Sequence, residues 1–368
     1  MKKRFLSILL TLCMGLSILP GRAWATDSEF TIENGTLTSY NGPGGDIVVP
    51  GNVTSIGMYT FLNCVNLTSV TMSSSVTKIE TGAFIGCTSL SSITIPNSVI
   101  SIGDSSFSEC ENLKNVIIHN SVTDIGDWAF ANTGLISVTI PGSVTSIAER
   151  TFFNCKELKS LTLLSGVTDI GMSAFEGCES LTKITIPNTV SNIGSSAFSS
   201  CTNLENIIIP AGVTRISMYA FDNCTKLASV VLPESITKIE SRTFSRCTNL
   251  VNMTIPGSIT DVELEAFTES GLTQVAYEKT TADWLKITGG DISTNGLRIR
   301  ESLTEGEYLY RYVPVQCIDG TIGGSNQPSD KEYTLSYNLA GGTGDVPGDM
   351  CINAGSKIQI PTEEPTRK

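Results

Sequence analysis

The chain has 368 residues, a formal net charge of −12 and only 16% charged residues, with a single histidine. Nucleic acid and anionic membrane surfaces repel an acidic chain of this kind, which excludes functions that need a basic surface. The many Ser, Thr and Asn residues indicate a surface that is polar and mostly uncharged.

The first segment has the pattern of a secretory leader. Residues 1–4 carry three positive charges, an apolar run follows over residues 5–19, and the small residues Ala23 and Ala25 come next. This run is shorter than the roughly 20 residues that a membrane-spanning helix needs. We therefore expect a signal peptide over residues 1–25, cleaved after Ala25, and a secreted or cell-surface protein without membrane insertion. Cleavage leaves 20 basic and 36 acidic residues, a net charge of −16.

The middle of the chain repeats one unit ten times. A segment of the type Val-Thr-x-Ile recurs at intervals of 23 residues, with one interval of 22, and a phenylalanine follows eight residues after the start of each segment. The full unit reads Ser-Val-Thr-x-Ile-Gly-x-x-Ala-Phe-x-x-Cys-x-x-Leu-x-x-Val-x-Ile-Pro. The phenylalanines are Phe61, Phe84, Phe107, Phe130, Phe152, Phe175, Phe198, Phe221, Phe244 and Phe267.

Each unit contains two strand-like pieces and one turn. Leu-x-x-Val-x-Ile ends in period-two alternation, and Val-Thr-x-Ile is β-branched, so both favour strands. Ala-Phe-x-x-Cys is too short for a regular α-helix and predicts a helical or 3₁₀ turn. One unit cannot bury its own apolar residues, so the units must stack. The sequence therefore predicts a β-rich solenoid of ten coils of about 23 residues, on the order of 50 Å long at the spacing of paired strands.

This unit resembles the BspA-like leucine-rich repeats of secreted and surface bacterial proteins, over about residues 30–303. By this resemblance, residues 26–52 are the N-terminal cap, 53–277 the repeat array, and 278–319 a C-terminal cap with an irregular β segment. The sequence Phe30-Thr-Ile-Glu-Asn-Gly resembles the strand that covers the first coil in the family, and the segment around Trp284 resembles its closing coil.

The tail lacks the repeat. Residues 320–331 have the Gly, Ser and Pro composition of a linker. Residues 332–368, with Tyr-Asn-Leu-Ala-Gly-Gly and a terminal Pro-Thr-Arg, resemble part of a Listeria-Bacteroides repeat, a small β-rich module of bacterial surface proteins. The aromatic stretch that follows Pro-Thr-Arg in that family is missing here, so we expect a partial module with an incomplete core.

Two coils depart from the pattern in the same way. In the segments 130–135 and 267–272 the cysteine is absent and the coil is one residue shorter. We expect Thr133-Gly134 and Ser270-Gly271 to form tighter turns there.

The remaining eight coils place a cysteine at one phase of the repeat. Stacked equivalents have parallel side chains, which is poor geometry for a disulfide. We expect a buried ladder of reduced thiols, although a disulfide framework is the alternative in a secreted protein. These residues are Cys64, Cys87, Cys110, Cys155, Cys178, Cys201, Cys224 and Cys247.

No constellation predicts catalysis, a metal or a cofactor. His119 follows a strand and has no nucleophile that could be assigned to it, so it is expected to be an exposed turn residue. Acidic residues such as Asp104, Glu109 and Glu111 do not pair at repeating offsets. The sequence lacks Cys-x-x-Cys or Cys/His clusters. We therefore expect a protein that is not an enzyme, without cofactor or catalytic, cofactor-binding or metal-binding residues.

The candidate binding face is the strand Leu-x-x-Val-x-Ile, where alternation sends Leu, Val and Ile inward and the intervening residue outward. Most of this outward row is threonine, which suits any exposed ladder. Neighbouring exposed aliphatics at Ile208 and Val231 favour a contact site. The candidate residues are Thr71, Thr94, Ile117, Thr139, Thr162, Thr185, Ile208, Val231 and Thr254, with Ala276 next in the row.

Two functions are compatible with this pattern. The first is a recognition or adhesion protein, a monomeric array that binds an extracellular protein or glycan, which the family resemblance implies. The second is the non-catalytic binding arm of a larger secreted enzyme whose catalytic domain lies beyond Lys368. Further β modules would favour the first, and a downstream protease or glycosidase domain would favour the second.

Overall fold

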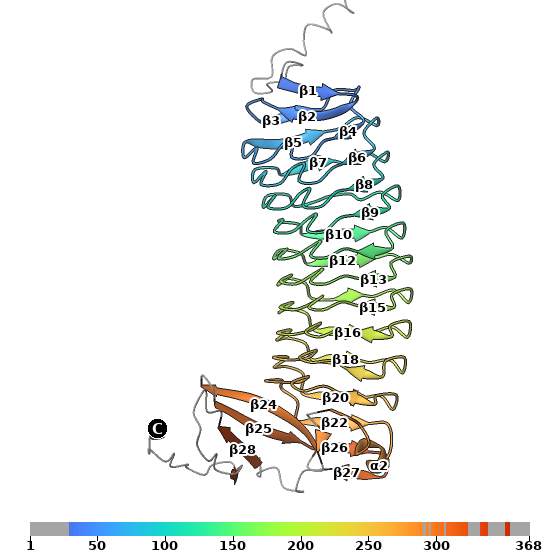
Figure 1. Cartoon of the computed structure of the whole chain (residues 1–368), viewed down its shortest axis with the longest axis vertical. Helices are drawn as coiled ribbons and strands as arrows, with labels where there is room; N and C mark the ends of the chain where they lie inside the picture. Colours follow the sequence, from blue (N-terminus) through green and yellow to red (C-terminus); the bar gives the residue numbers. More distant parts are fainter. Residues whose placement is uncertain are drawn as a thin grey trace, which may run out of the picture.

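A computed structural model describes residues 29–289, 292–293, 296–304, 307–322, 332–337 and 350–353. Its main body is a solenoid whose coils stack along the longest axis of the molecule (Figure 1). The predicted signal peptide, most of the predicted linker and much of the predicted tail module lie outside the described residues.

Each coil contributes to two columns of parallel strands. The first column contains the Leu-x-x-Val-x-Ile strands in register, for example Val138 opposite Leu161 and Ile207 opposite Val230. Isolated bridges at Asn115 and Lys183 connect its shorter segments. The parallel strands of the first column are β3 (Gly45–Val48), β5 (Leu67–Thr71), β7 (Ser92–Thr94), β10 (Ser137–Ile140), β12 (Ser160–Leu163), β14 (Ile184–Thr185), β16 (Asn206–Ile208), β18 (Ser229–Val231), β20 (Asn252–Ile255), β22 (Gln274–Tyr277) and β26 (Val315–Cys317), and β27 (Gly320–Ile322) pairs antiparallel with β26 at the C-terminal end.

The second column contains the Val-Thr-x-Ile strands, which are two residues long and also parallel, as where Ile170 lies opposite Ile193. At its N-terminal end, β1 and β2 form an antiparallel hairpin, and β2 pairs with β4 of the first coil. The strands are β1 (Phe30–Glu33), β2 (Thr36–Tyr40), β4 (Ser55–Ile56), β6 (Lys78–Ile79), β8 (Ser101–Ile102), β9 (Asp124–Ile125), β11 (Ser146–Ile147), β13 (Asp169–Ile170), β15 (Asn192–Ile193), β17 (Arg215–Ile216), β19 (Lys238–Ile239) and β21 (Asp261–Val262).

A ladder of phenylalanine rings forms the centre of the core. All ten ladder rings are 0% exposed, and neighbouring rings stack with centroids 4.8 to 5.7 Å apart. Tyr40 and Phe30 extend the ladder beyond the first coil, at 5.2 and 5.3 Å. Identical residues therefore repeat at the spacing of paired strands, which is why one sequence unit fills every layer of the core.

The third side of each coil, here called the turn column, differs from the predicted helical or 3₁₀ turn. Hydrogen bonds with the spacing of a 3₁₀ turn are present, as from the amide of Cys64 to the carbonyl of Phe61 (3.1 Å). However, the residues two before and two after each ladder phenylalanine have positive φ, as Tyr59 and Asn63 do. This conformation turns alternate amides toward the next coil, and Phe61 donates to Ala83 (2.8 Å). The backbone donors of the turns are thereby paired without a helix.

The C-terminal cap replaces a further coil with three separate segments. Thr288 accepts a hydrogen bond from the amide of Val262 (2.8 Å) in the second column. Arg300 accepts one from the amide of Glu269 (2.9 Å) in the turn column, and β26 pairs with β22 in the first column. The short helix α2 (Thr281–Trp284) buries Trp284 against Tyr277, with ring centroids 5.4 Å apart. The last coil is therefore covered on all three sides.

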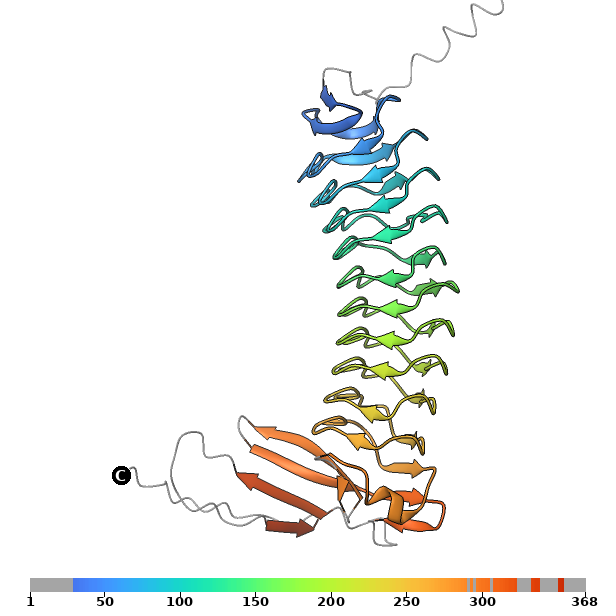
Figure 2. The same cartoon turned by 45° about the vertical axis from the view of Figure 1, so that its right-hand side comes forward.

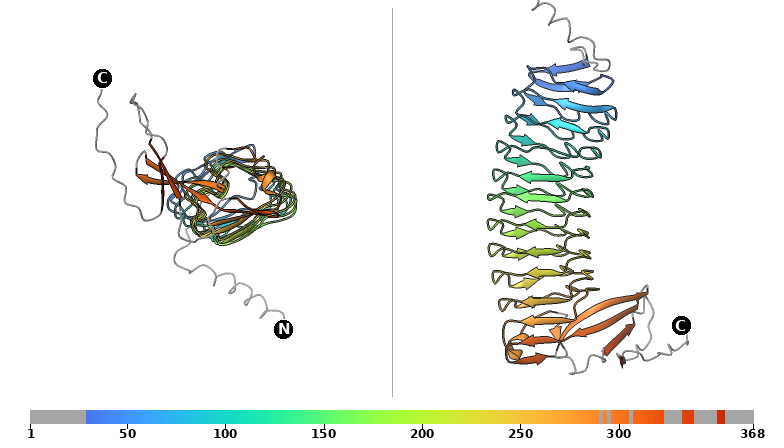
Figure 3. Two further views of the ribbon diagram at one scale, coloured as in Figure 1. Left: turned by 90° about the horizontal axis from the view of Figure 1, so that it is seen from below. Right: turned by 180° about the vertical axis from the view of Figure 1, so that it is seen from behind.

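An antiparallel sheet projects sideways from this end of the solenoid (Figures 2 and 3). The segment predicted as irregular contains its two longest strands, and strands of the predicted tail module extend the same sheet. The first three residues of the predicted linker lie in β27, which pairs with β26. The predicted boundaries at 320 and 332 thus do not separate independent sheets. The strands are β23 (Ile292–Ser293), β24 (Gly296–Thr304), β25 (Glu307–Val313), β28 (Glu332–Tyr337) and β29 (Met350–Asn353).

Candidate binding surface

The structure places every predicted binding residue on the outer side of the first strand column. Thr71, Thr94, Thr139, Thr162, Thr185 and Thr254 are all exposed, as are the aliphatic members of the row and Ala276. The alternating Leu, Val and Ile residues of the same strands point into the core, as in the buried–exposed pattern of β10. The predicted direction of these side chains is confirmed.

A second outward row, which the sequence reasoning missed, runs parallel to the first. It lies two residues earlier in each strand, and the same period-two alternation would have identified it. Lys183 is its only charged member. The residues are exposed, or half-buried at Ser69, and they are Ser69, Ser92, Asn115, Ser137, Ser160, Lys183, Asn206, Ser229, Asn252 and Gln274.

Aliphatic residues interrupt the threonine row at three points. Ile117 and Ile208 are 69% exposed and Val231 is 53% exposed. Ile208 and Val231 lie directly opposite each other in β16 and β18. A shallow depression begins at Val231 and continues past Thr254 and Ala276, and a smaller one contains Ile117. Val231 and Ile117 therefore each lie at a depression, and Ile208 lies next to the first of them.

The hydroxyls and amides of the first column have few partners within the protein. Among the side chains that the structure describes, only Ser69 in these two rows forms a side-chain hydrogen bond, to Asp46 (2.6 Å). The other Ser, Thr, Asn and Gln side chains of the rows are free to bind a ligand or water.

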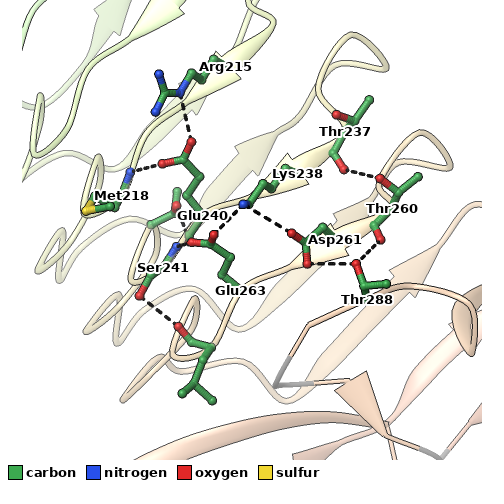
Figure 4. Close-up of polar contacts among 12 residues, drawn as sticks. Arg215, Met218, Thr237, Lys238, Glu240, Ser241, Thr260, Asp261, Glu263 and Thr288 are labelled. Atoms are coloured by element: carbon green, nitrogen blue, oxygen red, sulfur yellow. Dashed lines mark hydrogen bonds and ion pairs between the residues drawn. The ribbon is translucent and has the colours of Figure 1, made fainter.

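The second column differs, because its outward hydroxyls bond to the preceding coil. Thr260 donates to the carbonyl of Thr237 (3.2 Å), and Thr288 donates to that of Thr260 (3.1 Å), as Figure 4 shows. The same arrangement recurs along the column, at Thr54, Thr77, Thr123, Thr168, Ser191 and Thr214. These groups hold coils together and are less available to a ligand.

Ion pairs next to this column add to the same internal network. Lys238 lies 2.5 Å from Glu263 and 3.4 Å from Asp261 (Figure 4). The hydrogen bond from Lys238 lowers the pKa of Glu263, and the same contact raises the pKa of Lys238. The oxygens of Glu240 accept from Arg215 (3.0 Å) and from the amide of Met218 (2.9 Å). These carboxylates therefore already have hydrogen-bond or ion-pair partners within the protein.

The eight ladder cysteines lie beside the phenylalanine ladder. From Cys87 onward each thiol donates to the carbonyl of the phenylalanine in the preceding coil, as Cys178 does to Phe152 (3.3 Å). Burial raises the pKa of the Cys178 thiol well above 9.0. A protonated thiol that already donates a hydrogen bond is a poor nucleophile. The predicted thiol ladder is confirmed in position and burial, with Cys64 half-buried.

The remaining features to consider in the described part of the chain are the single histidine, possible metal ligands and possible membrane-spanning helices. His119 is half-buried, not exposed as expected, and it directly follows Ile118, which packs into the core. No group of three or more His, Cys, Asp or Glu residues within the described ranges could hold a metal ion. None of the described helices is long and apolar enough to cross a membrane.

Comparisons with known proteins place this geometry in a family. Residues 40–159 and 146–274 match the family described as "BspA type Leucine rich repeat region (6 copies)". A leucine-rich repeat protein from Bacteroides ovatus is 25% identical, with a TM-score of 0.52, and the match covers 67% of this chain and 68% of that one. A leucine rich cell surface protein from Faecalibacterium prausnitzii is 28% identical, with a TM-score of 0.48 and coverage of 72% and 97%. Among curated proteins, no significant match was found.

Proposed function

Because the chain belongs to the BspA-type leucine-rich repeat family, we propose that it is a non-catalytic extracellular recognition protein that binds a protein or glycan through its first strand column. BspA-type repeats are typical of surface and secreted bacterial proteins. The leader-like segment at residues 1–25 supports export.

The observation that carries this proposal is the contrast between the two strand columns. Thr185 lies on a strand of the first column, and Thr168 directly precedes β13 of the second; both threonines are exposed. Thr168 donates to the carbonyl of Thr145 (3.0 Å), whereas the hydroxyl of Thr185 has no partner among the described residues. Only the first column therefore presents rows of free hydroxyls and amides, and such groups supply specificity when a partner pairs with them.

The aliphatic residues of the first column supply the apolar part of the contact. Ile208 and Val231 lie together at the edge of the depression that continues over Thr254 and Ala276. Burial of exposed aliphatic area contributes about 25 cal/mol per Å². A partner that covers these two side chains would gain apolar contact, and the surrounding hydroxyls would orient it.

The nearly uncharged rows lead to a specific experiment. The mature chain is presented to immobilised extracellular matrix proteins and to glycans, and each capture is repeated from about 0.15 M to about 1 M salt, where the Debye length falls from about 8 Å to about 3 Å. We expect a captured partner to stay bound at high salt. Loss of all capture at high salt would show that charged groups, and not the uncharged side chains of the rows, do the binding, contrary to the proposal.

A further inference from the structure

The turn column begins at the first coil, because the N-terminal cap has no turn of the repeat. β2 ends at Tyr40 and β3 begins at Gly45, so only the four residues 41–44 connect the two strand columns of the cap. In the first coil, which contains Phe61, the ten residues 57–66 make this connection between β4 and β5. Cys64 of this coil is half-buried, whereas the other seven ladder cysteines are buried. The cap therefore leaves the N-terminal side of the first turn uncovered.

Three backbone carbonyls of the first turn are left without donors. In each of the eight coils that follow, the carbonyls three before, one before and one after the ladder phenylalanine accept hydrogen bonds from amides of the preceding coil, at 2.7 to 3.1 Å. The equivalent carbonyls of the first coil belong to Met58, Thr60 and Leu62. None of the described residues donates a hydrogen bond to them. A row of unpaired backbone groups of this kind is a template for another polypeptide segment.

The side chains of the same turn are apolar. Met58, Tyr59, Leu62 and Val65 are each about half exposed, between 47 and 56%. The third coil has two acidic residues and two serines at these four positions, residues 104, 105, 108 and 111. The end of a solenoid that contacts only water is normally polar, so an apolar patch at this end indicates a contact surface. The three carbonyls and these four side chains are here called the open edge.

A second copy of the chain does not supply the missing donors. The amides of Tyr59, Phe61 and Asn63 already donate to the second coil, so two open edges would face each other with acceptors only. At the other end of the turn column, the amide of Glu269 donates to Arg300 of the C-terminal cap (2.9 Å). A segment of a different protein, with free backbone amides and apolar side chains, meets both requirements of the open edge.

We infer that the open edge binds a backbone segment of a partner protein, which donates alternate amides to the three carbonyls and packs apolar side chains on the patch. The segment takes the place that the preceding coil takes at every later turn. In recognition of this kind, backbone hydrogen bonds supply affinity and side-chain contacts supply specificity. This site lies on the turn column, separate from the first strand column, and does not depend on the binding proposed there.

The test uses the full mature chain and a peptide that copies residues 81–86, acetyl-Thr-Gly-Ala-Phe-Ile-Gly-amide, followed by saturation-transfer NMR. In the protein, the amides of Gly82, Phe84 and Gly86 donate to the third coil at 2.8 to 2.9 Å. A second peptide carries N-methyl groups on these three amides, and a control peptide carries one on threonine only. We expect the unmodified and control peptides to bind at least about ten-fold more tightly than the triply methylated one, equivalent to about 1.4 kcal/mol.

Two protein variants locate the bound peptide. Met58→Glu/Leu62→Glu places charge on the patch and should weaken binding at least about ten-fold. Met218→Glu/Leu264→Glu changes the same residue types at exposed positions of the same column (44 and 48%) and should bind like the parent protein. Absence of binding, equal binding of the triply methylated peptide, or equal weakening in both variants would overturn the inference. A dimer in sedimentation that only Met58→Glu/Leu62→Glu dissociates would also overturn it, because a second copy would then occupy the edge.

Discussion

The thiol of Cys201 donates a hydrogen bond to the backbone carbonyl of Phe175 in the preceding coil, with 3.3 Å between Sγ and O. The contact recurs at seven cysteines, and it joins the thiol ladder to the phenylalanine ladder layer by layer. Each of these thiols therefore already donates a hydrogen bond in the native state. In the first short coil, Thr133 takes the cysteine's place and its hydroxyl lies 3.2 Å from the Cys155 sulfur.

We predict that the buried ladder thiols are reduced and unreactive in the folded protein. Because the thiols are buried and protonated, a small thiol reagent at neutral pH should modify them only after unfolding. Counting of modified thiols in native and denatured protein, with mass mapping of each site, checks this. Half-buried Cys64 is the internal control and should react first. Disulfides between adjacent coils in the native protein would refute the prediction.

The same burial predicts a loss of stability at high pH. Burial raises the pKa of Cys155 to about 11 and that of Cys201 to about 12. The unfolded chain releases these protons near pH 9, before the folded chain does, so the thiols' contribution is complete below pH 9 and is lost as the pH rises toward 11 to 12. Urea unfolding at pH 8 and pH 10.5 measures the loss.

Other groups also titrate in this range, so the matched variant Cys201→Ala isolates the thiol. The free energy of unfolding should fall less between pH 8 and pH 10.5 in this variant than in the parent protein. The difference should be about 1.4 kcal/mol for each pH unit between the pKa of the thiol in the unfolded chain and pH 10.5. A decrease identical to that of the parent protein would show that the Cys201 thiol does not contribute.

Phe175→Ala should be strongly destabilising. The Phe175 ring is fully buried between those of Phe152 and Phe198, with centroids 5.5 and 5.4 Å away. Its removal costs about 3 to 5 kcal/mol through lost transfer energy and the cavity left behind. Chemical denaturation measures the cost, and hydrogen exchange should show the damage first in the adjacent coils.

The half-buried Phe153 is the control for this substitution, because it lies next to the ladder and contacts only Trp128 among the aromatic rings of the described residues. Phe153→Ala should cost clearly less than Phe175→Ala. Equal costs would show that the ladder has no special role in stability.

Arg311→Leu should loosen the C-terminal cap. The substitution leaves the carbonyls of Ser270 and Leu272 without the donor that Arg311 supplies. A buried polar group without a partner costs about 1 to 3 kcal/mol. Hydrogen exchange should increase in β22 and β25. The control Arg215→Ala removes an ion pair with Glu240 from a side chain that is 64% exposed, and it should cost about 1 kcal/mol or less. Unchanged exchange in the cap would contradict the assigned role of Arg311.

Much of the fold follows from the repeat alone. The interval of 23 residues and the period-two alternation correctly predicted the buried ladder at Phe175 and the exposed position of Thr185. The conformation of the turns was not predicted, although Gly82 and Gly86 mark the two positive-φ positions of their coil. In most other coils, residues such as Tyr59 adopt the same conformation and hide this signal.

Other features depend on contacts that no periodicity encodes. Thr168 and Thr185 belong to similar threonine ladders in the sequence, but only Thr168 reaches the carbonyl of the preceding coil. This difference depends on where each side chain stands relative to the neighbouring backbone. Arg311 lies about forty residues after Ser270, in a segment without repeats, so its insertion beside the last short coil could be found only in the folded chain.

The most direct test of the proposed binding face is the affinity of Ile208→Thr/Val231→Thr for the captured partner. Ile100→Thr is the matched control, since Ile100 is an isoleucine of similar exposure (51%) on the second column. Neither variant should change the free energy of unfolding by more than about 0.5 kcal/mol, as is usual for surface substitutions. The double variant should bind at least about ten-fold more weakly, equivalent to about 1.4 kcal/mol, while Ile100→Thr should bind like the parent protein. Full binding by Ile208→Thr/Val231→Thr, or equal weakening by Ile100→Thr, would contradict the assignment of the first strand column as the binding surface.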